Sequence, residues 1–137
     1  MTEKELKTGA KKFAVAILNL VDGLPNRRSA NIIGNQLGRS ASSVASNYRA
    51  ALGARSHAEF ISKIGIVGEE ADESEFWLDI LPYTKNSTAE TIIPLISEAK
   101  ELTSIFIAAS KTAKRNKIQN EADRISQFFN SKIPKSS

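Results

Sequence analysis

The chain has 137 residues, 41% of them hydrophobic, which is enough for one domain with a real hydrophobic core. It contains no cysteine, which excludes disulfides and thiolate catalysis and fits a reducing compartment. The residues after Met1 are polar, unlike a signal peptide, and no apolar run approaches the roughly 20 residues that span a membrane. These features predict a soluble, cytoplasmic protein of bacterial type.

The formal net charge of +4 conceals a strong pattern along the chain. Residues 1–63 carry 10 basic and 4 acidic side chains (+6), residues 64–110 carry 2 and 9 (−7), and residues 111–137 carry 7 and 2 (+5). An acidic segment between two basic ones is compatible with pairing between helices, pairing between subunits, or a basic surface for nucleic acid. Composition alone leaves these three interpretations open.

Four amphipathic segments follow one another, at about residues 3–21, 28–52, 56–81 and 87–114. In the first, Phe13, Ile17 and Val21 recur every fourth residue, as on one face of a helix. The second is rich in small residues, which let a neighbouring helix approach closely. Gly34 and Gly38 each lower helix propensity by about 1 kcal/mol relative to alanine, so a bend or break is expected near Gly38.

The last two segments have recognisable starts and stops. Ser56 precedes Glu59 by three residues, and Ser87 precedes Glu90 by three, which is the spacing of a capping box. Pro82 is expected to end the third segment. After the fourth segment, a sparser apolar pattern suggests a helical extension or a short fifth helix, with Ile118, Ile125, Phe128 and Phe129.

No stretch alternates in the manner of a β-strand, and short turns join the helical segments. These observations predict an all-α protein, an antiparallel up-and-down four-helix bundle. We expect the bundle to occupy residues 1–117. Residues 118–137 are expected to form the helical extension and a disordered tail.

Six carboxylates crowd the stretch from Glu69 to Asp79 and raise the question of a metal or catalytic site. A di-iron site in a bundle needs Glu-x-x-His motifs, but His57 is the sole histidine and no such motif occurs. No nucleophile stands beside a base, and Gly34 and Gly38 belong to no phosphate-binding P-loop. We therefore predict no metal, no cofactor and no enzymatic activity.

Helix geometry gives the acidic stretch another role. Glu69 and Glu73 lie four residues apart, and like charges at that spacing repel by a few tenths of a kcal/mol. Basic side chains on a neighbouring helix or subunit would offset this repulsion. Arg49 is the partner we expect for Glu69 or Glu73, within or between subunits; other basic residues are also available, at Arg39, Arg55 and Lys63.

Binding of RNA or DNA requires clustered basic side chains, which neutralise phosphates and release the condensed counterions into solution. The candidates are Lys11, Lys12, Arg27, Arg28, Lys111, Lys114, Arg115 and Lys117. The rival interpretation is that these residues form solvated helix ends and that the protein is a structural or protein-interaction scaffold.

Three stretches carry a resemblance to a known family: residues 44–50 (VASNYRA), 55–61 (RSHAEFI) and 68–78 (GEEADESEFWL). They resemble the four-helix-bundle proteins encoded by intervening sequences of bacterial large-subunit ribosomal RNA, which are related to the accessory proteins of diversity-generating retroelements. The resemblance covers about residues 10–115. A common family motif, Asn-Ile-Ala-Glu, reads Asn-Tyr-Arg-Ala at residues 47–50, so its acidic position is replaced.

The resemblance implies an up-and-down bundle assembled into a homopentameric ring. It also implies nucleic acid and a reverse transcriptase as partners, because the retroelement accessory proteins bind the first and associate with the second. It supplies no catalytic residues. Alternating basic and acidic helices would suit a ring, in which each subunit meets the next through different surfaces. Trp77 is the residue we expect to anchor such a subunit interface.

Overall fold

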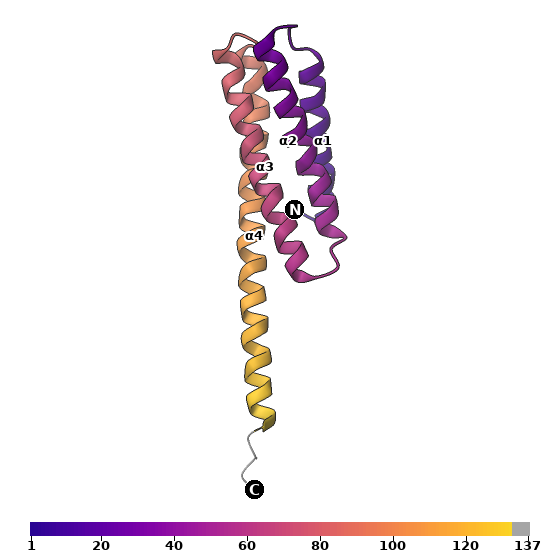
Figure 1. The fold of residues 1–137 in the computed structure, drawn as a ribbon, viewed down its shortest axis with the longest axis vertical. Helices are drawn as coiled ribbons and strands as arrows, with labels where there is room; N and C mark the ends of the chain where they lie inside the picture. Colours follow the sequence, from indigo (N-terminus) through magenta and orange to yellow (C-terminus); the bar gives the residue numbers. More distant parts are fainter. Residues whose placement is uncertain (133–137) are drawn as a thin grey trace.

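The computed structural model describes residues 1–132 and consists of four helices with no strand in that range. They are α1 (Glu3–Asp22), α2 (Arg28–Leu52), α3 (His57–Tyr83) and α4 (Ala89–Lys132). The helices run alternately up and down, as predicted, and α4 is much longer than the rest (Figure 1). Helix α1 packs chiefly on α2, α2 on α3 and α3 on α4, whereas α1 touches α4 at few points.

Three helix starts are fixed by side-chain caps that accept backbone N–H groups, and at α1 the cap is Thr2, whose Oγ1 accepts from Glu5 N at 3.1 Å. The Ser56 hydroxyl accepts from Glu59 N at 3.0 Å, so this predicted N-cap of α3 is confirmed. A start of α4 near Ser87 or Thr88 was predicted, and Thr88 is the cap, because its Oγ1 accepts from Thr91 N at 3.3 Å. Helix α4 begins at Ala89 and continues through Pro94, which lies in its second turn and cannot donate a hydrogen bond to the carbonyl group of Glu90.

Helix α2 is continuous through Gly38, so the expected bend or break is absent. Side chains near the end of α1 occupy the space that the glycines leave. A Cβ atom on Gly34 would lie 3.3 Å from Val21 Cγ1, and one on Gly38 would lie 3.5 Å from Leu18 Cδ2. The loss of helix propensity is therefore offset by close packing of α1 against α2.

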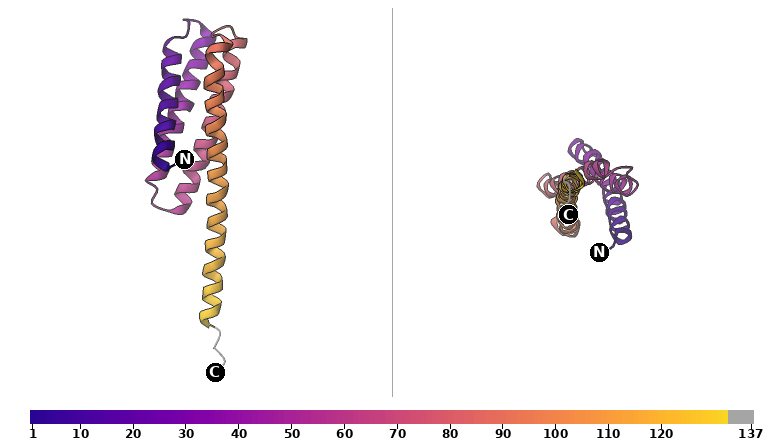
Figure 2. Two further views of the ribbon diagram at one scale, coloured as in Figure 1. Left: turned by 180° about the vertical axis from the view of Figure 1, so that it is seen from behind. Right: turned by 90° about the horizontal axis from the view of Figure 1, so that it is seen from below.

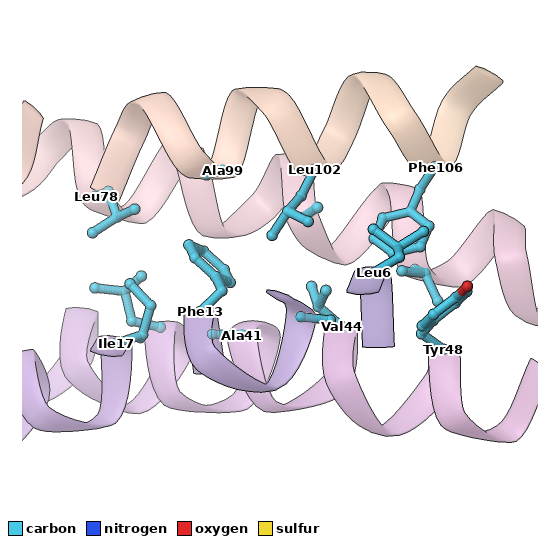
Figure 3. Packing of buried hydrophobic residues seen from close by; sticks show 14 of the residues in the cluster. Leu6, Phe13, Ile17, Ala41, Val44, Tyr48, Leu78, Ala99, Leu102 and Phe106 are labelled. Carbon is cyan, nitrogen blue, oxygen red and sulfur yellow. The ribbon is translucent and has the colours of Figure 1, made fainter. Parts of the chain in front are cut away.

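All four helices contribute to one hydrophobic core. At its centre, Phe13 of α1 and Phe106 of α4 are fully buried, and the ring of Tyr48 lies 5.1 Å from that of Phe106 (Figure 3). Two buried hydroxyls cross between α2 and α3, where Ser40 Oγ and Ser74 Oγ are 2.8 Å apart. None of the described helices is long and apolar enough to cross a membrane.

The bundle ends before α4 does. His57, the first residue of α3, has its Nε2 2.9 Å from the carbonyl oxygen of Ala113. Beyond Ala113, α4 continues alone past the other three helices (Figures 1 and 2). This extension, residues 114–132, is one unbroken continuation of α4 and not a separate fifth helix. Residues 133–137, part of the expected disordered tail, lie outside the described chain.

The turn between α3 and α4 is a Schellman motif built on an unfavourable residue. Lys85 N donates to Pro82 O at 3.0 Å and Asn86 N donates to Leu81 O at 3.1 Å, which satisfies the last carbonyls of α3. The motif places Lys85 in the left-handed region, with φ of 62°. Arg27 Nη1 donates to Asn86 Oδ1 at 3.1 Å and so ties this turn to the start of α2.

Replacing Lys85 with glycine should therefore stabilise the protein. A non-glycine residue with this backbone conformation costs about 1–2 kcal/mol, part of which glycine returns as extra freedom of the unfolded chain. We expect Lys85→Gly to raise the free energy of unfolding by roughly 0.5–1 kcal/mol in urea melts. Lys85→Ala removes the same charge but keeps the Cβ atom, so it should give no comparable gain.

Candidate nucleic-acid interface

A basic groove runs between α1 and α2. Its cationic lining comes from positions 4, 7 and 11 of α1 and from Arg49 of α2, so three successive turns of one helix place lysines on the same side. Small residues of α2 form the floor, at Ser42, Ala45 and Ser46. The groove encloses about 700 Å³ and is open to solvent. We call this site the α1–α2 groove; its four cations are Lys4, Lys7, Lys11 and Arg49.

All the charged side chains that line the α1–α2 groove are positive. No carboxylate lines it, and within residues 1–132 none of its four cations forms an ion pair. Hydroxyl groups of Thr8 and Ser42 add neutral donors, whereas that of Ser46 donates to the carbonyl oxygen of Ser43 at 3.4 Å. Like charges three or four residues apart on a helix repel each other by a few tenths of a kcal/mol. A bound polyanion would relieve that repulsion, whereas a cation would increase it.

The predicted basic residues are not brought together as one site. Lys11 lines the groove, but its neighbour Lys12 does not. Arg27 and Arg28 lie at the other end of α2 from Arg49, and Arg27 is engaged with the α3–α4 turn through Asn86 and two backbone carbonyls.

The basic residues of α4 face a mixed environment. Lys111 and Lys114 line a groove between α3 and α4 together with Glu69 and Asp72, so the local field is largely cancelled. Arg115 and Lys117 are exposed at the start of the extension. The basic residues of α4 and those of the α1–α2 groove lie toward the same end of the bundle. Of the two sites, only the α1–α2 groove has no carboxylate in its lining.

The acidic stretch of α3 does pair with α2, but through a different arginine from the one predicted. Arg39 Nη1 donates to Glu70 Oε2 at 3.0 Å, and its Nη2 donates to Glu73. The prediction of Arg49 as the partner within the chain was wrong, because Arg49 lies on the α1 side of α2. Glu69 is exposed, and a pairing of Glu69 or Arg49 with another subunit stays a prediction.

The pKa values of the two carboxylates in the arginine bridge shift in opposite directions. Hydrogen bonding from Arg39 lowers the pKa of Glu73. Burial raises the pKa of Glu70, against the attraction of the same guanidinium. The bridge therefore holds Glu73 ionised, and the indole Nε1 of Trp77, 3.4 Å from Glu73 Oε1, supports the same carboxylate.

Trp77 and Phe76 divide between the inside and the outside of the bundle. Trp77 packs against the hydrophobic core, and Phe76 is 55% exposed with its ring centroid 5.0 Å from that of Trp77. Of the two, Phe76 is therefore better placed to contact another molecule than the predicted Trp77. Among residues 1–132 no group of three or more His, Cys, Asp or Glu could hold a metal ion.

The chain is similar to a solved helical structure and matches a protein family. It is an all-helical bundle, and one solved structure shares that fold with a TM-score of 0.75 and 33% sequence identity. That relative is a protein of unknown function from the S23 ribosomal protein family of Bacteroides thetaiotaomicron; the match covers 81% of this chain and 99% of the relative. Residues 3–108 match the 23S rRNA-intervening sequence protein family, and the chain belongs to that family. No curated protein matches it significantly.

Sequence reasoning missed Lys4, Lys7 and Arg49 as members of a basic site. The signal was present for the lysines, since positions 4, 7 and 11 have the spacing of one helix face. For Arg49 no signal existed, because only the packing of α2 against α1 shows which of its faces meets the lysines.

The arginine bridge can be tested with a double-mutant cycle. Arg39→Met and Glu73→Gln should show a coupling energy of about 0.5–1 kcal/mol in urea melts at neutral pH, within the range for partly exposed pairs. A lowered pKa means that Glu73 contributes stability above the ordinary glutamate pKa and loses it as the pH falls through the lowered value. The coupling should therefore vanish in acid. Arg49→Met with Glu73→Gln is the matched control; coupling there instead would contradict the assignment.

Proposed function

We propose that this protein is a non-enzymatic nucleic-acid-binding bundle whose α1–α2 groove holds the phosphate backbone. The observation that supports this proposal is the convergence of four cations without ion pairs on a groove that no carboxylate lines. Contacts of this kind bind phosphates without reading sequence.

The dimensions of the basic row suit a nucleic-acid strand. Lys4, Lys7 and Lys11 span about 10 Å along the helix axis at 1.5 Å per residue. One strand of a duplex presents a phosphate about every 3.4 Å of axis, so the row matches about three phosphates. Arg49, on the opposite wall, can add planar hydrogen bonding to a phosphate oxygen.

The family is named for the intervening sequences of 23S rRNA, so structured RNA is the first ligand to test. A homopentameric ring and an accessory role beside a reverse transcriptase, which the resemblance implies, belong to the same proposal. A ring would repeat the α1–α2 groove in every subunit, so that weak contacts with one long nucleic acid would sum to a useful avidity.

A protein-interaction scaffold is the second candidate, and one surface favours it. Glu69, Asp72, Phe76, Asp79 and Tyr83 recur every three or four residues along an exposed side of α3. Phe76 and Tyr83 are 55% and 81% exposed within this acidic row. Aromatic rings surrounded by carboxylates suit a basic protein partner.

Fluorescence anisotropy of labelled structured RNA and of duplex DNA, at several salt concentrations, tests the proposed function. Log affinity falls as log salt concentration rises, and each lost phosphate contact makes this slope less steep by about 0.9 for a duplex. We therefore expect the double variant Lys7→Gln/Lys11→Gln to bind more weakly and to reduce the slope by about 2.

The matched control is Lys12→Gln/Arg28→Gln, which removes the same charge outside the α1–α2 groove and should change binding little. Equal weakening by both variants would overturn the assignment of the groove while leaving nucleic-acid binding itself in place. Absence of binding to either ligand at low salt would overturn the proposed function and favour the acidic side of α3 as a protein-docking surface.

A further inference from the structure

The extension of α4 carries an apolar row that the bundle does not cover. Ile118, Ile125 and Phe129 are 68%, 58% and 57% exposed, and Ala122 lies on the same side. Successive spacings of four, three and four residues keep these positions within one face of the helix. We call these four residues the extension row. It lies beyond residue 108, where the family match ends.

An isolated extension of this kind lacks an evident source of stability. A single helix of this length is marginal in water, because most helix stability in proteins comes from packing an apolar face. Residues 114–131 are all exposed, and this part of α4 runs clear of the other helices (Figures 1 and 2). A partner that covers the row would supply the missing packing.

The row is symmetric under reversal, which makes a second copy of this chain a suitable partner. Read in either direction, its spacings are four, three and four residues. An antiparallel second copy therefore places Ile118 opposite the other copy's Phe129 position, and Ala122 opposite the other copy's Ile125 position. Each layer pairs unlike side chains, and the inner layer sets a small residue against a larger one. Such self-complementarity is the property of a two-fold contact.

Charge and area favour the same arrangement. Lys114, Arg115 and Lys117 stand at the base of the extension, so parallel copies would align like charges, whereas antiparallel copies place them at opposite ends. The exposed side chains of the row present on the order of 400 Å² of largely apolar surface per copy, taking 150–250 Å² as the area of a large free side chain. With flanking residues, two copies approach the roughly 1,000 Å² that a specific interface requires.

We propose that two copies of this chain associate through an antiparallel pairing of their α4 extensions, centred between Ala122 and Ile125. At 1.5 Å per residue, residues 114–132 span roughly 28 Å, so the tip of each extension would reach the base of the other bundle. The contact uses none of the residues that line the α1–α2 groove.

Because the chain contains no cysteine, only cysteines introduced by substitution can form disulfides in the test. Full-length Ile118→Cys and Phe129→Cys proteins, distinguishable by mass, are oxidised separately and as a mixture. A disulfide needs Cα atoms within about 7 Å, so the antiparallel contact predicts mixed 118–129 disulfides and few 118–118 or 129–129 products. Gln127→Cys, about 200° round the helix from Ile125, is the control and should cross-link poorly with any of them.

A second variant confirms that the apolar row is responsible. Ile125→Glu should lower the yield of the mixed disulfide at least tenfold, and Gln127→Glu, with the same added charge on the opposite side, should leave it unchanged. Circular dichroism establishes that each variant is folded. Preferential 118–118 disulfides would show a parallel contact and overturn the proposal. Folded proteins that give no mixed disulfide at high concentration would overturn it as well, because a second copy would then not cover the row.

Discussion

The close approach of α1 to α2 is the contact on which both the packing and the proposed site depend. Over Gly34 and Gly38, apolar side chains from the end of α1 fill the space between the helices. Farther along the same pair, α2 offers small residues and Arg49, and α1 presents lysines, which stay in solvent and do not fill the gap. One helix pair thus forms a tight joint at one end and an open basic groove at the other.

Charge in this protein is separated by face more than by segment. The acidic stretch of α3 contributes Glu70 and Glu73 to a bridge with Arg39, Glu75 lies 3.9 Å from Lys100 of α4, and other carboxylates point outward. The negative charge of α3 is therefore either balanced by ion pairs with neighbouring helices at the surface or left exposed. The groove between α1 and α2 keeps its positive charge, because neither of those helices directs a carboxylate into it.

Periodicity and capping act over a few residues, so they can be recognised in the sequence. They predicted the four helices, the Ser56 cap, and core positions such as Phe13 and Ile17. The pairing of α2 with α3 was anticipated, but not its arginine. Arg39 and Arg49 are ten residues apart, about 80° short of three full turns, so they occupy different faces. Which face meets which neighbour depends on how α2 is rotated in the bundle. The continuity of α2 at Gly38 depended likewise on side chains of α1.

The sparse contact between α1 and α4 gives the bundle an uneven distribution of local stability. Helix α1 is held chiefly from one side, so within the packed part of the bundle its detachment is the least costly partial opening, and its amides should exchange with solvent before those of α3. The groove exists only while α1 is docked. Any ligand held there would therefore slow hydrogen exchange throughout α1, including at residues it never touches, because binding and docking are thermodynamically linked.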